Sequence, residues 1–246
     1  MDRMLYVAMS GAQQTMLAQH ANNNNLANAN TYGFRADLSA FRSMPVFGEG
    51  YASRVYAMAE RPAFDHSIGM IRSTGRDLDV SVESNGWISV QARDGSEAYT
   101  KAGNFSIGPG SLLVTGAGHP VLGEGGPIAL PPSERIIVGA DGTVSVQPIG
   151  QPANLLVVVD RIKLVNPDKS QMIKGADGLI RLKGGAEAEP DASVKVVSGS
   201  LETSNVNIVD GLVNMIELSR QYESQVKLMR TAQENDQKMD SMLQLG

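Results

Sequence analysis

Apolar residues follow a helical period near the N-terminus of the chain. The segment from Asp2 to Asn28 has no proline and a single glycine. Its apolar positions recur every three or four residues, interrupted by a run of asparagines: Leu5, Met9, Ala12, Met16 and Leu26. This spacing predicts an amphipathic helix, with Asp2 as the N-cap. The asparagine run forms helix poorly, so this helix should be weak in isolation.

The C-terminal zone has the clearest helical pattern. Apolar residues keep a three-and-four spacing along one face, with polar Ser219 in one position: Ile208, Leu212, Met215, Tyr222, Val226 and Met229. Ile216, Met239 and Leu243 extend this apolar face. Asn207 and Asp210 form a helix start signal, so we predict a helix over 207–243, about 55 Å long. A long helix with a narrow apolar face requires a partner helix. We therefore expect both helices to pack against other copies. The N-terminal residues listed above should face Leu212, Met215, Ile216, Tyr222, Val226 and Met229.

The middle of the chain has the pattern of short strands. Clusters of Val, Ile and Leu alternate with turn pairs such as Asn85-Gly86, Asp94-Gly95, Asp141-Gly142 and Asp177-Gly178. The strands predicted from these clusters are Leu78–Val82, Trp87–Ala92, Leu112–Val114, Arg135–Val138, Thr143–Val146, Leu155–Val165, Leu179–Leu182 and Ser193–Val197. Strands this closely spaced, without helices between them, predict an antiparallel sandwich or irregular barrel.

The predicted class is therefore α+β, with long terminal helices pairing as a coiled-coil-like module around an all-β middle domain. The expected segments are 1–34 (an assembly helix and the motif described below), 35–75 (an extended connector), 76–200 (the β domain) and 201–246 (the C-terminal assembly helix). We also expect the free chain to be a monomer with mobile termini, leaving a protease-resistant core of roughly residues 35–200.

Composition and charge exclude several classes of function. The net charge is −5 with no basic cluster, which argues against nucleic-acid binding. The absence of cysteine excludes disulfides, thiolate chemistry and cysteine-ligated metals. No cleavable signal peptide is readable, and the longest purely apolar run, Leu155–Val159, is far shorter than the roughly 20 residues of a membrane-spanning helix. We therefore expect no direct membrane insertion.

No residue pattern predicts a catalytic, cofactor or metal site. His20, His66 and His119 lie far apart, without a second ligand at helical spacing. Asp77 and Asp79 share one face of a strand and are the residues that an enzyme hypothesis would use, although a charged strand edge is the simpler interpretation. The glycine-rich segment 116–126 matches neither phosphate-binding motif and is expected to be a loop.

Three motifs resemble those of bacterial flagellar rod and hook proteins. The first is Asn25-Leu26-Ala27-Asn28-Ala29-Asn30-Thr31-Tyr32-Gly33-Phe34, in which Gly33 permits a left-handed exit from the helix. The second runs from Arg76 through Gly86-Trp87 to Phe105, and the third is Gly199–Val206 followed by Met215-Ile216-Glu217 and Arg220-Gln221-Tyr222-Glu223. Trp87-Ile88 stands where the family usually carries a Phe-Phe pair.

The resemblance implies a structural subunit of the flagellar basal-body rod, most similar to a proximal rod protein. It implies export through the flagellar type III apparatus without a cleaved signal, and a place in the rod within the periplasmic space. The implied partners are copies of the chain itself, proximal and distal rod proteins and the export apparatus, with no cofactor. The assembly interface would comprise the apolar residues of both helices together with Asn28, Thr31, Gly33 and Phe34.

Two other functions stay open at this point. The first is a distal rod or hook-type subunit of the same family. The second is a secreted binding module, with the β domain displayed on a coiled-coil stalk. A concentration-independent trimer in light scattering would favour the stalk.

Overall fold

The computed structural model describes residues 4–45, 55–60, 63–152 and 155–243. Within these residues the chain forms two compact units. The first unit comprises 1–29, 36–64 and 206–246, and the second comprises 30–35 and 65–205. The first is largely helical and the second is built of strands, so the predicted α+β class is correct.

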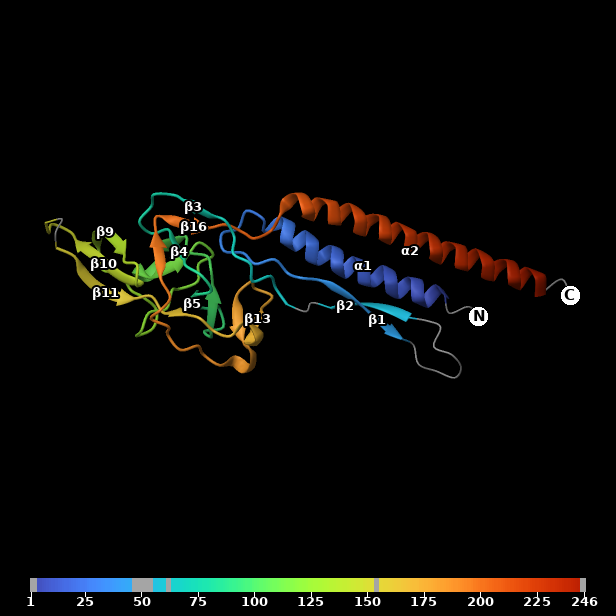
Figure 1. Cartoon of the computed structure of the whole chain (residues 1–246), viewed down its shortest axis with the longest axis horizontal. Coiled ribbons are helices and arrows are strands. Elements are labelled where there is room, and N and C mark those ends of the chain that lie inside the picture. The colour runs from blue at the N-terminus through green and yellow to red at the C-terminus, as the bar shows by residue number, and fades with distance from the viewer. Residues whose placement is uncertain (1–3, 46–54, 61–62, 153–154, 244–246) are drawn as a thin grey trace. The chain divides into compact units, whose positions relative to one another are not determined.

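Two long α-helices dominate the first unit. Helix α1 spans Met4–Ala27 and α2 spans Ile208–Leu243, and they pack side by side (Figure 1). The start of α2 is capped as predicted, because Asn207 Oδ1 accepts a hydrogen bond from Val209 N at 3.0 Å. Asn207 Nδ2 also donates to Asp210 Oδ2 at 2.7 Å. The predicted cap at Asp2 lies outside the described residues.

A β-hairpin completes the first unit, in the region expected to be a connector. Strand β1 (Ala40–Pro45) pairs antiparallel with β2 (Val55–Glu60), from Ala40 opposite Glu60 to Pro45 opposite Val55. Strand β2 packs against α1. Helix α1 is therefore covered on two sides, by α2 and by this hairpin.

The second unit is a set of small antiparallel sheets around one core. Its strands are β3 (Ile71–Ser73), β4 (Val80–Val82), β5 (Trp87–Gln91), β6 (Glu97–Thr100), β7 (Phe105–Ile107), β8 (Leu113–Thr115), β9 (Ser133–Val138), β10 (Thr143–Pro148), β11 (Val157–Arg161), β12 (Leu164–Val165), β13 (Met172–Lys174), β14 (Ile180–Leu182), β15 (Val196–Ser198) and β16 (Ser200–Glu202). The largest sheet has the order β12-β5-β6-β14-β13, and a second has the order β11-β10-β9. The remaining strands form the pairs β15-β4, β16-β3 and β7-β8.

Three of the four predicted turns have the expected backbone. Gly95, Gly142 and Gly178 have φ between 80° and 86° and connect β5–β6, β9–β10 and β13–β14. The Asn85-Gly86 prediction was wrong in detail, because the positive φ falls on Ser84, at 54°. Position 86 requires glycine because it has no room for a side chain: a Cβ there would lie 2.2 Å from Val194 Cγ1.

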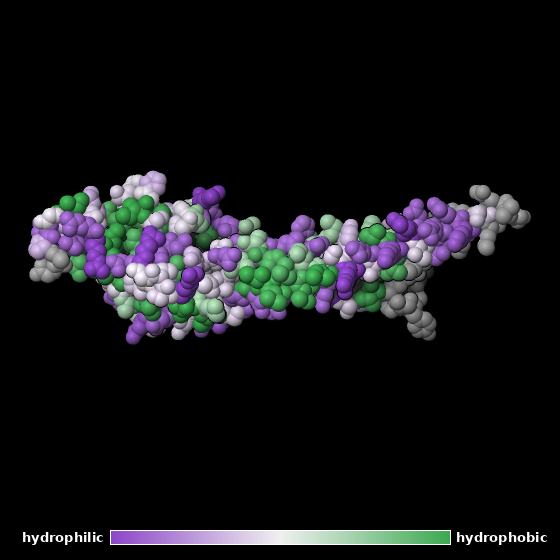
Figure 2. Space-filling model, turned by 90° about the horizontal axis from the view of Figure 1, so that it is seen from above, coloured by the Kyte–Doolittle hydropathy of each residue, from purple (hydrophilic) through white to green (hydrophobic). Residues whose placement is uncertain are grey.

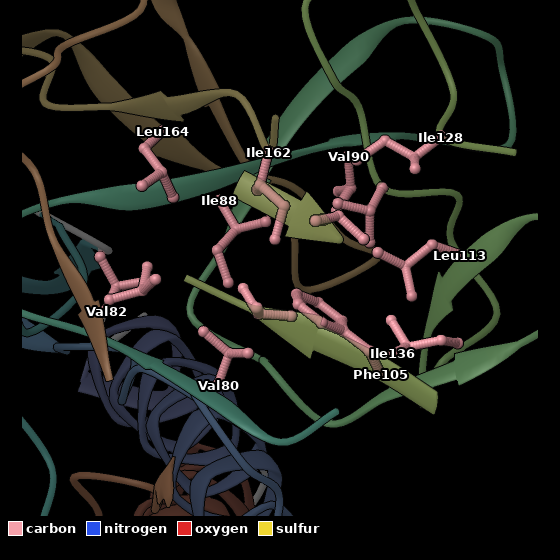
Figure 3. Packing of buried hydrophobic residues seen from close by; sticks show 14 of the residues in the cluster. Val80, Val82, Ile88, Val90, Phe105, Leu113, Ile128, Ile136, Ile162 and Leu164 are labelled. Carbon is pink, nitrogen blue, oxygen red and sulfur yellow. The ribbon is translucent and has the colours of Figure 1, made fainter. Parts of the chain in front are cut away.

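One apolar core holds the second unit together. Its buried side chains come from most of the small sheets and point toward one another, with Phe105 near the centre (Figure 3). The labelled members are Val80, Val82, Ile88, Val90, Phe105, Leu113, Ile128, Ile136, Ile162 and Leu164. Aliphatic residues dominate the core, as the low aromatic content of 5% requires.

Candidate assembly interface

The face of α1 that is buried within the first unit consists of small residues. Ala8, Ala12, Thr15, Ala18 and Ala21 are all buried. The hydroxyl of Thr15 donates to the carbonyl of Gly11 at 2.9 Å, so its polar atom is satisfied within the helix. Small side chains allow neighbouring backbones to approach closely.

The large apolar side chains of α1 face outward. Tyr6, Met9, Met16 and Leu17 are between 44% and 59% exposed. The predicted apolar face combined Ala12 with Met9 and Met16, and the structure separates them, because only Ala12 is buried. Leu5 and Leu26 are half-buried. Within one chain, Met9 and Met16 therefore do not form the buried contact with α2, since the helix buries its alanines there instead; their contact with α2 of another copy stays a prediction.

Helix α2 divides its apolar residues in the same way. Gly211 and Ala232 are buried, and between them lie the half-buried Met215, Leu218, Tyr222, Val226 and Met229. Leu212 and Ile216, which were predicted to face α1, are 43% and 54% exposed, and Ile208 of the predicted apolar face is 43% exposed. Val209 and Val213 extend this exposed group, at 68% and 49%. The buried face begins at Gly211 rather than at Ile208 or Leu212.

Contacts at two levels fix how α1 and α2 run past each other. Asn22 Nδ2 donates to the carbonyl of Gly211 at 2.8 Å. Further along, a Cβ built at Gly11 would lie 3.1 Å from the Gln225 side chain. Moving toward the start of α1 therefore means moving toward the end of α2, so the two helices are antiparallel.

The first asparagines of the motif close the end of α1. Asn25 pairs with the backbone of Asp37, donating to its carbonyl at 2.9 Å and accepting from its N–H at 2.8 Å. Asn28 Nδ2 donates to the carbonyl of Asn24 at 2.9 Å, which satisfies an acceptor in the last turn. An asparagine amide both donates and accepts, and Asn25 uses both functions here.

The second half of the motif belongs to the second unit. Gly33 has φ +68°, and its N–H donates to the carbonyl of Glu202 at 2.9 Å. A Cβ at Gly33 would lie 2.3 Å from the backbone N of Ala102, so no other residue fits without moving the backbone. The Phe34 ring lies 3.9 Å from Lys174 Nζ, and the carbonyl of Phe34 accepts from Asn205 N at 3.4 Å.

A buried carboxylate, Glu202, joins these segments. Its Oε1 accepts from Arg35 Nη2 at 2.6 Å and from the Gly69 N–H at 2.8 Å. Lys101 Nζ lies 3.7 Å from Oε2, an ion-pair separation rather than a hydrogen bond. The side chains of Arg35, Lys101 and Glu202 are no more than 2% exposed.

Trp87 lies beside both cations of this cluster. The Arg35 guanidinium carbon is 5.7 Å and Lys101 Nζ is 5.6 Å from the Trp87 ring centroid, within range of cation–π attraction. Two cations share one carboxylate, so the cluster carries an excess positive charge. Burial lowers the pKa of Lys101 to about 8, against the opposing attraction of Glu202. Lys101 Nζ also donates to the carbonyl of Ser84 at 2.8 Å.

The residues considered for chemistry do not come together. Asp77 forms an exposed ion pair with Arg135 at 2.9 Å, whereas Asp79 is buried and lies 3.4 Å from Arg76 Nη1. His119 is buried within a turn, where its N–H donates to Thr115 Oγ1 at 3.2 Å. Among the described residues, no group of three or more His, Asp or Glu side chains could hold a metal ion. Of the helices in that part of the chain, none is both long and apolar enough to cross a membrane.

Two family models match the chain, and both describe flagellar hook and rod proteins. The model described as "Flagellar hook protein FlgE/F/G D1 domain" matches residues 81–146, within the β unit. The model described as "Flagellar basal body rod FlgEFG protein C-terminal" matches residues 197–242, which include β16 and most of α2. The chain is therefore a structural protein of the flagellar rod and hook class, whose motifs its sequence resembles.

Full-length relatives narrow this class. The chain is 41% identical to the flagellar basal-body rod protein FlgF of Salmonella typhimurium and 40% identical to that of Escherichia coli, over alignments of 252 positions that cover all of each chain. It is 35% identical to FlgF of Caulobacter vibrioides over 93% of both chains. The chain belongs to the FlgF family of flagellar basal-body rod proteins. It is a structural subunit of the basal-body rod and interacts there with other rod subunits.

Proposed function

We propose that the chain polymerises through α1 and α2 in the proximal part of the rod, and so forms part of the drive shaft. The observation that carries this proposal is the outward exposure of large apolar side chains on both helices. Scattered exposed apolar residues are ordinary, but groups of them on two paired helices indicate a surface that a partner covers.

The sixteen predicted interface residues divide by position. Five are exposed and would contact neighbouring subunits: Met9, Met16, Ile208, Leu212 and Ile216. Seven are buried or half-buried and would hold α1 and α2 together as a coiled-coil-like pair: Leu5, Ala12, Leu26, Met215, Tyr222, Val226 and Met229. Asn28, Thr31, Gly33 and Phe34 would fix the chain where it passes between the helical and the β unit.

The family also suggests how the chain reaches its place. It would leave the cytoplasm through the flagellar type III export apparatus with its ends unfolded and without a cleaved signal, and then lie in the periplasmic part of the basal body. Its neighbours would be copies of itself and the other proximal and distal rod proteins. In this proposal, 1–34 and 201–246 are the assembly segments, 35–75 connects them to the outer layer, and 76–200 forms that layer.

The test is a charge placed on the exposed face of α2. Leu212→Asp with Ile216→Asp should abolish swimming and leave basal bodies without a complete rod, when this variant replaces the natural copy in its own host. A buried aspartate without a partner costs several kcal/mol. Asn214→Asp is the matched control, because it adds the same kind of charge at an exposed position on the same helix. Normal swimming by the double variant would overturn the proposal.

A further inference from the structure

Each long helix carries a group of outward apolar side chains, here called its stripe. The α1 stripe is Tyr6, Met9, Met16 and Leu17, and the α2 stripe is Ile208, Val209, Leu212, Val213 and Ile216. The α2 stripe follows the three-and-four spacing that places residues on one helical face. In the α1 stripe, Met9 and Met16 are seven residues apart, or two turns, and the exposed Gln13 lies between them. Figure 2 shows the α2 stripe as a dense apolar patch over the first turns of α2, with hydrophilic surface further along the helix.

The two stripes lie at different levels along the helix pair. The α1 stripe is centred near Gly11, which lies level with Gln225, whereas the α2 stripe begins beside Gly211, which lies level with Asn22. The level of Gly11 and Gln225 is separated from the level of Asn22 and Gly211 by 11 residues along α1 and by 14 residues along α2. At 1.5 Å per residue, the stripes are offset by roughly 20 Å.

At each level the neighbouring helix presents polar groups. Beside the α1 stripe, α2 exposes Arg220, Glu223 and Lys227, together with one apolar residue, Leu228. Beside the α2 stripe, α1 exposes His20, Asn23 and Asn24. A neighbouring copy without an axial shift would therefore place the α1 stripe against charged residues of α2. A copy shifted by the offset would place one stripe on the other.

The symmetry of the assembly favours the shifted arrangement. A stripe that pairs with its own copy makes an isologous contact, which closes at a dimer. Two different surfaces that pair head to tail generate an extended ring or helix. A rod subunit requires the second kind of contact.

On these grounds we propose that the α1 stripe of one subunit covers the α2 stripe of a second copy, displaced by about 20 Å along the helices. This inference rests on the proposed function, in that it assumes the terminal helices are assembly surfaces. It adds that the α1 stripe contacts the α2 stripe, and it adds the axial displacement between neighbouring copies.

Disulfide cross-linking tests this pairing directly, because the chain has no natural cysteine. Met9→Cys and Val213→Cys are made in two separately tagged copies and co-expressed in cells that lack the natural copy. Basal bodies are then isolated and oxidised. A disulfide requires Cα atoms about 4.4–6.8 Å apart, so a mixed dimer forms only if the two stripes meet. We expect mixed dimers to be the main cross-linked species.

The matched control replaces the second site with Glu223→Cys, an exposed position on α2 at the level of the α1 stripe itself. This combination should give few mixed dimers. Three results would each overturn the staggered pairing: dimers formed only between two copies of the same variant, preferential linkage to position 223, or no linkage in basal bodies that contain both variants. The proposed function fails separately, if the aspartate variants described above assemble normally.

Discussion

At the scale of single residues, Glu202 is the most connected group of the second unit. It holds Arg35 and Gly69, which come from segments far apart in the sequence, and lies close to Lys101. Glu202→Gln would remove the negative charge that faces these two buried cations. Because breaking a buried ion pair typically costs about 3–5 kcal/mol, the free energy of unfolding of the β unit should fall by about that amount.

Trp87, the single tryptophan, is buried beside the cluster and allows urea unfolding to be followed by fluorescence. Asp77→Asn is the control, since its ion pair with Arg135 is exposed and should contribute at most about 1 kcal/mol. Equal effects of the two substitutions would show that the buried cluster does not stabilise the unit.

Lys101 should make the stability of the same unit depend on pH. Its pKa is about 8 in the folded chain, while an unfolded lysine titrates near 10.5. Between these values the unfolded chain binds more protons, so the free energy of unfolding should rise as pH increases from 8. Up to pH 10 the gain should be at most about 3 kcal/mol.

Tyr99 acts in the opposite direction, but only at higher pH. Burial raises its pKa to about 12, so its contribution changes only as the pH rises above about 10. Urea unfolding between pH 8 and 10 therefore isolates the lysine. Lys101→Met should flatten the rise over this interval, and an unchanged slope in that variant would assign the dependence to another group.

Sequence reasoning found part of this residue-scale site. The left-handed conformation of Gly33 was predicted and is confirmed by its φ of +68°. Its close approach to the backbone of Ala102 was not predictable, because it depends on a partner almost 70 residues away. Arg35 and Glu202 were missed, since charged residues are usually exposed. Arg35 directly follows the first motif and Glu202 lies within the third, and this proximity to the motifs could have identified them as candidates.

At the scale of elements, the long helices were predictable and the short strands less so. The predicted start and end of α2 agree with the structure to within one residue, because an apolar pattern of that length has few alternatives. The eight predicted strands all contain observed strand residues, and Leu155–Val165 proved to be the two strands β11 and β12. Strands β1, β2, β3, β6, β7, β13 and β16 were missed. Four of them, β3, β7, β13 and β16, have three residues each, which are too few to establish a period.

The facing of the helices was the main error at this scale. Large apolar residues were assigned to the contact between α1 and α2, and the structure uses alanine, threonine and glycine on the α1 side. Hydrophobicity alone cannot separate a face buried within one chain from a face reserved for a neighbour. Side-chain size could have separated them, because two backbones approach closely only over small residues.

This packing predicts that α1 tolerates larger residues only on its outward face. Ala12→Leu should overpack the buried face and lower the stability of the helical unit by about 1–3 kcal/mol. Gln13→Leu is the matched control, because it introduces the same side chain at the adjacent exposed position. Thermal unfolding followed by far-ultraviolet circular dichroism should show a lower midpoint for Ala12→Leu alone. Equal midpoints would contradict the assignment of the small face.

At the scale of the whole molecule, the two units differ in how much apolar surface they bury. The second unit has a continuous core of large aliphatic side chains, whereas the α1 side of the helix pair buries mainly small ones. Because stabilisation scales with the apolar area buried, the helices should open locally far more often than the β unit. The free subunit should therefore have labile ends on a stable β unit.

Limited proteolysis with trypsin would measure this difference. In the free chain, cleavage should begin at the exposed Arg220, Lys227 and Arg230 of α2 and at Arg42 of β1. The fragment that contains 65–205 should persist, and the N-terminal piece that ends at Arg42 should stay bound to it through the Arg35–Glu202 ion pair and the Lys174 contact with the Arg35 carbonyl at 2.7 Å. Native mass spectrometry would detect that complex, and Glu202→Gln should release the piece. Cleavage within the β unit as rapid as cleavage of α2 would contradict the division of stability.

In isolated basal bodies the α2 sites should be protected, because the neighbouring subunits that cover the stripes would also prevent the helix from opening.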